Sequence, residues 1–503
     1  MKELDPRIPT PPWASPPPAP ALDALWLAVA ALAAYVSLGQ STLFNRDAHV
    51  LLDRLGEGDL LHGHHLLYFP FLHGVHAVAG ELGWSRFESA RLASAIGMAI
   101  GVAFIHLACR HLRLPRLDAM LATALVAACP AMLFFATVVE VHGPFYMTAG
   151  LASLAAAGFC VTPRIGTALG LGLALGLASS AHASAHLMAG GLIGVLWCRT
   201  RRCHPSLGVA SHAMLLGLAV AVQGAAIFGV PAAVGALGFP REYDAAVHLK
   251  NNILMLAARP DWPQEAPALA WAELRKEWLQ PMAPLCVAFL AGVGKPRLVA
   301  ETIGLLLGAL PYLALVVVLL AHFPDASERG AYLLPLVWPA ALITAAAWHR
   351  VLVAAMVVLA AGIGFLQIRA HDQPQASHEY ATGLRTAAGP KPAYLVVGDY
   401  QDLEALHVQL PEVEYLFVTD LIGRVPVPES QLPLFLQGID QILGQALDDG
   451  MAVFLTEGAE RFLGAAETAA WVSAPALLKH LRSHYALASV QEGGFRGSRL
   501  SRR

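Results

Sequence analysis

Charged residues are scarce in this sequence. They make up 14% of its 503 residues, whereas hydrophobic residues make up 56%. A soluble globular domain carries about 25% charged residues, so a fold in water would leave much of this apolar surface exposed. A lipid bilayer accepts such a surface. Together with a mean hydropathy of +0.55, the composition predicts a polytopic integral membrane protein.

An excess of basic residues is also lacking. The formal net charge is −3 and the sequence pI is about 6.7. A nucleic-acid groove must offset a row of phosphates with Lys and Arg. The charge balance therefore excludes nucleic acid as a partner.

Cysteine is rare too, with six residues, and no Cys-x-x-Cys pair occurs. All six lie in or beside apolar runs, which excludes a disulfide framework and a thiolate metal site. Residues 1–21 contain eight prolines and no apolar core. They lack the features of a cleavable signal, so we predict a disordered, proline-rich cytoplasmic arm.

Long apolar runs are abundant. A spanning helix needs about 20 mainly apolar residues, and this length predicts about eleven spans, with an error of one or two. They are 22–43, 88–109, 118–138, 142–161, 165–181, 183–198, 208–229, 281–294, 300–321, 331–348 and 350–368. The division of 165–198 into two spans rests on a small break at residues 179–182.

The distribution of arginine gives an orientation. Every second junction between spans is rich in Arg and Lys, whereas the turns at 139–142 and 179–183 contain neither. The positive-inside tendency then places the N-terminus on the cytoplasmic side of the membrane, which we expect to be a bacterial-type inner (plasma) membrane. An odd number of spans places the C-terminus outside.

Three segments are expected outside the bilayer. Two are outer loops of the membrane domain of residues 22–370: loop 44–87, whose mixture of polar and apolar residues favours interfacial helices, and loop 230–280, whose tryptophans favour the headgroup layer. The third is the tail, residues 371–503, where short Val-rich runs alternate with polar helical stretches. This alternation predicts a small extracytoplasmic α/β domain with a mainly parallel sheet. No Gly-x-Gly-x-x-Gly follows its strands, so a nucleotide site has little support.

Two carboxylates invite a functional interpretation, because charges near the membrane core cost several kcal/mol unless they are paired or solvated. Glu140 ends the third span and Asp47 follows the first. Each also has a purely structural interpretation, in which Glu140 reaches the outer headgroups and Asp47 caps the helix that follows it. Both are expected on the outer face, at the mouths of helices adjacent in sequence.

Histidine is abundant, with 21 residues, several of them around the same outer mouth. Imidazole and carboxylate together can hold a divalent cation. Since no HExxH or comparable spacing is present, the cofactor is unknown, and a divalent metal ion is left open. Interfacial histidines bonded to backbone and headgroups are the alternative for most of them.

Four short segments carry a family resemblance: Asn45-Arg46-Asp47 after the first span, Tyr68-Phe69-Pro70 in the following loop, Val139-Glu140-Val141 after the third span, and Glu328–Pro335 before a late span. In these segments the sequence resembles the GT-C superfamily of polyprenyl-phosphate-sugar glycosyltransferases. The resemblance covers about residues 22–370. Protein O-mannosyltransferases and the aminoarabinose transferase of lipid A are of this kind.

The resemblance implies a membrane glycosyltransferase of inverting type, with a GT-C-like helical fold. It implies that a lipid-linked sugar donor and membrane lipid are partners, and that the acceptor is a lipid, glycan or protein. Asp47 and Glu140 would be catalytic, and Arg329 and Tyr332 would bind the donor phosphate. Supporting or metal-binding roles would fall to His49, His64, His65 and His142. The alternatives are a transporter with an intramembrane carboxylate and histidine relay, and a non-catalytic membrane scaffold.

Overall fold

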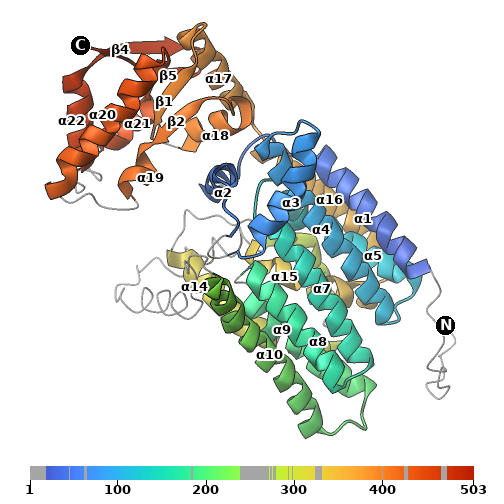
Figure 1. Cartoon of the computed structure of the whole chain (residues 1–503). Coiled ribbons are helices and arrows are strands. Elements are labelled where there is room, and N and C mark those ends of the chain that lie inside the picture. Colours follow the sequence, from blue (N-terminus) through green and yellow to red (C-terminus); the bar gives the residue numbers. More distant parts are fainter. Residues whose placement is uncertain are drawn as a thin grey trace. The chain divides into compact units, whose positions relative to one another are not determined.

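The fold is that of a computed structural model of the chain (Figure 1). It describes residues 19–503 except 45, 62–64, 183–184, 238–270, 272–274, 276–278, 293, 297, 323–330, 399, 424–428 and 466–472. Most of the proline-rich arm and most of the second outer loop therefore lie outside the described residues.

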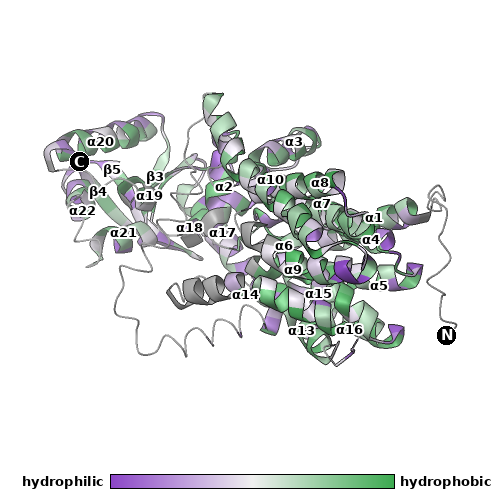
Figure 2. Ribbon diagram, turned by 90° about the horizontal axis from the view of Figure 1, so that it is seen from below, coloured by the Kyte–Doolittle hydropathy of each residue, from purple (hydrophilic) through white to green (hydrophobic). Residues whose placement is uncertain are grey.

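The apolar runs form helices where the sequence predicts them. The helices of the apolar part are α1 (Ala19–Ser37), α4 (Arg86–His111), α5 (Arg116–Ala127), α6 (Pro130–Thr137), α7 (His142–Val161), α8 (Ile165–Ala181), α9 (Ala185–Cys203), α10 (Val209–Ala236), α13 (Gln280–Gly292), α14 (Val299–His322), α15 (Leu334–Ala347), preceded by the 3₁₀ turn η2 (Ala331–Leu333), and α16 (Arg350–His371). The expected break between α8 and α9 is present at residue 182. Hydrophobic residues dominate these helices (Figure 2).

One expected span differs from the prediction. Residues 118–138 form two helices, α5 and α6, whose axes differ by 58°. Pro130 begins α6, and Cys129 before it has extended backbone angles. Proline has no amide hydrogen to donate and disfavours the helical conformation of the residue before it, so the helix is interrupted here.

By length and composition, five helices among the described residues are able to cross a membrane, or six if α5 and α6 form one bent span. Four further apolar helices in this part are shorter, at 165–181, 280–292, 299–311 and 334–347. The chain is thus a mainly helical membrane protein, and the count of eleven spans stays a prediction.

The chain divides into two compact units. The first consists of residues 1–39, 59–78 and 89–368, and the second of residues 40–58, 79–88 and 369–503. The first outer loop is therefore shared between them. Its helix α2 (Arg46–Glu57) belongs to the second unit, and most of its helix α3 (Tyr68–Glu81) belongs to the first.

Within the first unit, α9 and α14 pack at backbone distance. A Cβ atom built at Gly194 would lie 1.9 Å from the carbonyl oxygen of Gly304, and one built at Gly190 would lie 2.3 Å from that of Gly308. Small residues spaced by four let two helices approach in this way inside a membrane. Glycines therefore fix the contact between α9 and α14.

The tail forms an α/β domain with a mixed five-stranded sheet in the order β2-β1-β3-β5-β4. The strands are β1 (Ala393–Val397), β2 (Glu414–Phe417), β3 (Ala452–Thr456), β4 (Tyr485–Glu492) and β5 (Phe495–Arg502), and the helices are α17 (Gln375–Ala388), α18 (Tyr400–Gln409), α19 (Val418–Gly423), α20 (Leu432–Asp448), α21 (Glu457–Gly464) and α22 (Ser473–His484). β1 pairs with β2 and β3 in parallel, as predicted. The antiparallel hairpin β4–β5 was not expected from the sequence.

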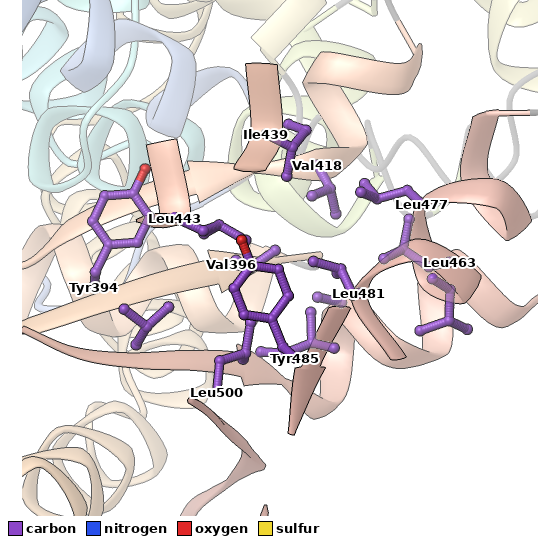
Figure 3. Packing of buried hydrophobic residues seen from close by; sticks show 14 of the residues in the cluster. Tyr394, Val396, Val418, Ile439, Leu443, Leu463, Leu477, Leu481, Tyr485 and Leu500 are labelled. Atoms are coloured by element: carbon purple, nitrogen blue, oxygen red, sulfur yellow. The ribbon is translucent and has the colours of Figure 1, made fainter. Parts of the chain in front are cut away.

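Both faces of this sheet are covered. Alternate residues of β1 enter different cores: Leu395 and Val397 pack with residues of α17 and α18, whereas Tyr394 and Val396 pack with residues of α20, α21 and α22 (Figure 3). Successive side chains of a strand point to opposite faces, so the fully apolar run of β1 is what a strand buried on both sides requires.

Candidate functional site

Glu140 lies in the short link between α6 and α7. α6 ends at Thr137, the backbone of Val138 is extended, and α7 begins at His142. The Glu140 side chain is almost fully buried, at 2% exposure, and its carboxylate accepts a hydrogen bond from the backbone N–H of Val141. Burying a carboxylate in an apolar helical unit costs free energy, so Glu140 is a candidate functional residue.

The backbone of Glu140 is held by Ser94 of α4. The Ser94 hydroxyl donates to the Glu140 carbonyl at 3.0 Å and accepts from the Glu140 N–H at 3.4 Å. α4 reaches this link because glycines remove side chains from the contact. A Cβ atom at Gly143 would lie 2.6 Å from the Ser94 Cα, and one at Gly97 would lie 2.3 Å from the Gly143 carbonyl carbon.

Tyr68, the first residue of α3, is buried beside this carboxylate. It is 1% exposed, and its hydroxyl has no hydrogen-bond partner within the described part of the chain. Burial raises the pKa of Tyr68, and the negative charge of Glu140 raises it further. The phenol therefore stays protonated, and its O–H remains able to donate to a ligand oxygen.

Three imidazoles from three segments meet in the same unit. The ring of His182, which follows α8, lies 4.8 Å from the ring of His65 and 5.1 Å from that of His142, centroid to centroid. His65 is fixed by the Ala181 carbonyl, 3.2 Å from its Nδ1. Nδ1 of His142 is buried and has no hydrogen-bond partner among the residues that the structure describes. This nitrogen of His142 can bind a polar ligand atom.

This arrangement does not suit a metal ion. His65 and His182 stack with an interplanar angle of 21°, so they face each other through their rings and not through their nitrogen atoms. Among the described residues, no group of three or more His, Cys, Asp or Glu could hold a metal. His64, one of the predicted ligands, lies outside the described residues.

The other predicted site residues are placed only in part. Asp47 is the second residue of α2 and Tyr332 is the middle residue of η2, but the structure describes only the backbone of these two residues. Arg329 lies outside the described residues. His49, on α2, belongs to the second unit, whereas His65, His142 and His182 belong to the first. Its ring lies 5.4 Å from that of His407. Burial, with a smaller effect of His407, lowers the pKa of His49 to about 3, so this imidazole is neutral.

An apolar pocket lies between three helices of the first unit. It is lined by residues of α13, α14 and α15 together with the last residue of η2, and these are Met282, Leu285, Cys286, Phe289, Leu305, Leu306, Ala309, Leu333, Leu336, Val337 and Ala340. A pocket with such a lining can take a hydrocarbon group and little else.

Sequence reasoning did not find Ser94, and it noticed Tyr68 only as part of a short motif. The available signal for Ser94 is a polar side chain in an otherwise apolar span. That signal is weak, because serine often bonds only to its own helix.

No family model matches this chain, and no curated protein matches it. Solved structures do. The chain is similar to ArnT from Cupriavidus metallidurans bound to undecaprenyl phosphate, with 15% identity over 95% of this chain and 97% of that one, and a TM-score of 0.42. It is also similar to the Archaeoglobus fulgidus oligosaccharyltransferase in its apo form, with 12% identity over 95% of this chain and 74% of that one, and a TM-score of 0.42.

A further structure of the Archaeoglobus protein, AglB with an inhibitory peptide and a dolichol-phosphate, gives 14% identity over the same shares and a TM-score of 0.41. ArnT and AglB are members of the GT-C superfamily, which the sequence resembles. At these scores and identities the similarity transfers no residue roles to this chain.

Proposed function

We propose that this protein is a membrane glycosyltransferase that moves a sugar from a polyprenyl-phosphate donor to an acceptor at the extracytoplasmic face. The observation that supports this most is the buried carboxylate of Glu140, a residue whose backbone is held by Ser94. The Tyr68 hydroxyl beside it has no hydrogen-bond partner among the described residues. Buried ionisable groups inside a membrane domain mark functional sites. The resemblance of the surrounding motifs gives the reaction class.

In the proposed reaction, a hydroxyl or amine of the acceptor attacks the anomeric carbon of the donor sugar. A new bond to this carbon forms as the bond to the phosphate oxygen breaks, with inversion, and the polyprenyl phosphate leaves with the bonding electrons. The acceptor loses its proton to a carboxylate acting as general base. Asp47 takes this role, and Glu140 orients the acceptor.

The leaving phosphate needs compensating charge and hydrogen bonds. Arg329 supplies a guanidinium that can bind two phosphate oxygens at once, and Tyr332 supplies a hydroxyl. Leu333, the residue after Tyr332, lines the apolar pocket between α13, α14 and α15. The prenyl chain would enter here. His49, His64, His65 and His142 are assigned supporting roles.

Hydrogen bonds at the ends of two spans support the predicted sidedness. The Asp372 carboxylate accepts from the Ser41 N–H at 2.8 Å and from the Thr42 hydroxyl at 3.3 Å, and the side chain of Gln40 lies 2.7 Å from Nδ1 of His371. A bilayer cannot separate segments that are bonded to each other. These bonds support the proposal that the end of the first span and the start of the tail share one side, as an odd number of spans predicts.

The experiment that tests this function compares lipid-linked intermediates in cells with and without the gene. An accumulating polyprenyl-phosphate sugar in the deletion strain would identify the donor. The purified protein should then transfer sugar from that donor, and Asp47→Asn should lower turnover by about 10²–10⁴-fold, the usual contribution of a general base. Wild-type turnover in a protein carrying both Asp47→Asn and Glu140→Gln would refute the proposal.

The group of three imidazoles, from His65, His142 and His182, favours a second candidate, which is a proton-coupled transporter. Proton uptake by proteoliposomes, coupled to a solute and lost in His182→Ala, would support it. The absence of matching halves in the hydropathy pattern and the one-sided soluble tail favour the transferase.

A further inference from the structure

Helix α2 carries a continuous apolar stripe, and it also contacts the tail. Ala48, Leu51, Leu52 and Leu55 are each at most 5% exposed, and their spacing of three and four residues places them on one helical face. Within the second unit, α2 contacts α18 of the α/β domain. An isolated helix of 12 residues is marginal in water, so this packing maintains α2 as a helix.

Polar groups fix the position of α2 on the tail. The Tyr415 hydroxyl, at the edge strand β2, donates a hydrogen bond to the Asp53 carboxylate of α2. Nε2 of His407 on α18 lies 3.4 Å from both the Asp53 carboxylate and the Tyr415 oxygen. Burial, and to a lesser extent the charge of Arg86, lowers the pKa of His407 to about 4. His407 is thus neutral at pH 7, and the three groups form a hydrogen-bonding cluster with one negative charge.

The side chain of Arg86 packs against the C-terminal end of α2. A Cβ atom at Gly56 would lie 2.3 Å from Nη1 of Arg86, which belongs to the same unit. The guanidinium therefore rests directly on the backbone of α2 where a side chain would otherwise stand. One end of the helix is bounded by Arg86, and its side is held by Tyr415 and His407.

We propose that Tyr415 and His407 are positioning residues for catalysis. By holding Asp53 they keep α2 folded and docked on the α/β domain, and with it Asp47, which stands about 9 Å earlier along the axis of the same helix. The α/β domain thereby takes part in sugar transfer without touching the sugar. This inference rests on the proposed function, in which Asp47 is the general base.

The test uses Tyr415→Phe in the full chain, which removes the donating O–H and keeps the ring. A hydrogen bond to a charged group is worth about 1.5–3 kcal/mol, so amide hydrogen exchange of residues 46–57 should accelerate on the order of 10- to 100-fold. Turnover should fall by about 10-fold, while KM for the polyprenyl-phosphate sugar stays unchanged. The matched control is Tyr485→Phe, since the Tyr485 hydroxyl donates to Asp440 at 3.0 Å within the same domain; it should leave both properties of α2 unchanged.

Variants of Asp53 separate hydrogen bonding from charge. Asp53→Asn keeps an oxygen that accepts from Tyr415 and should retain most activity, whereas Asp53→Ala should reproduce the losses of Tyr415→Phe. Unchanged exchange of residues 46–57 in Tyr415→Phe would overturn the docking. Faster exchange with unchanged turnover would overturn the positioning role. A wild-type protein that transfers no sugar would overturn the proposed function and the positioning role together, and the exchange data would still decide whether Tyr415 holds α2.

Discussion

The contact between Ser94 and Glu140 leads to the sharpest test of the buried site. Ser94→Ala removes the hydroxyl that bonds to both backbone groups of Glu140 and introduces no new bulk. The Glu140 side chain itself is unchanged. Any effect on sugar transfer must therefore come from the altered position of the carboxylate or from lost stability.

The two hydrogen bonds are unequal. The bond to the Glu140 carbonyl has an ordinary length of 3.0 Å, whereas the bond from its N–H is long, at 3.4 Å. Leaving a buried acceptor without its partner costs about 1–3 kcal/mol. Ser153 of α7 is the matched control, because it is also 2% exposed but donates only to the Ala149 carbonyl of its own helix at 2.8 Å. Removing such a bond is close to neutral.

The assay is turnover of the purified protein with a polyprenyl-phosphate sugar, together with thermal unfolding in detergent. Ser94→Ala should lower turnover by about 10-fold, equivalent to about 1.4 kcal/mol, and Ser153→Ala should leave it unchanged. In a Glu140→Gln background, Ser94→Ala should cause little further loss, because both substitutions disturb one group. Equal losses in both backgrounds would refute the idea that Ser94 acts through Glu140.

Three further predictions concern packing, pH and topology. Gly304→Ala should destabilise the helical unit by about 1–3 kcal/mol, because the new Cβ would lie 2.4 Å from the Gly194 carbonyl oxygen. The control Gly170→Ala, whose Cβ would meet nothing within 4 Å, should be neutral or stabilising in the same thermal assay. The second unit should lose stability as the pH falls from 6.5 towards 4, by about 3 kcal/mol from His407, because the folded state binds this proton less readily than the unfolded state. His407→Gln should reduce that dependence in unfolding experiments at several pH values, and the part due to His49 should remain. A cysteine that replaces the exposed Ser489 of β4 should react with an impermeant maleimide in intact cells, whereas the exposed native Cys203 should react only after permeabilisation. The reverse pattern would show that the predicted orientation, with the tail outside, is wrong.

Hydropathy was sufficient to locate the apolar helices, because a run of about 20 apolar residues has few alternatives to a helix. It did not reveal the bend at Pro130, where one run became two helices. In the tail, β1 and β3 were predictable because strands buried on both faces are continuously apolar. β4 and β5 were missed, since most residues of β4 are at least partly exposed and the pair is defined by its mutual hydrogen bonds.

Only those parts of the candidate site that depend on neighbouring residues in the sequence could be predicted. Glu140 stood out as a carboxylate in an apolar stretch. Its contact with Ser94 spans 46 residues and the contact of Asp53 with Tyr415 spans 362, and neither leaves a trace in the spacing of the sequence. The composition of the first loop suggested an interfacial helix, and it contained no sign that α2 would belong to the α/β domain.

The composite second unit has a consequence for biosynthesis. Residues 40–58 leave the ribosome more than 300 residues before α18 and β2. At synthesis rates of about 5–20 residues per second, α2 waits for tens of seconds before its docking surface exists. During that time α2 lacks its contact with α18 and its hydrogen bond from Tyr415, and a helix of 12 residues is marginal in water by itself. If translation stops before residue 400, the released chain contains α2 but neither α18 nor β2, on which α2 packs in the complete protein. The undocked α2 would then distinguish an incomplete chain from a complete one for quality-control proteases.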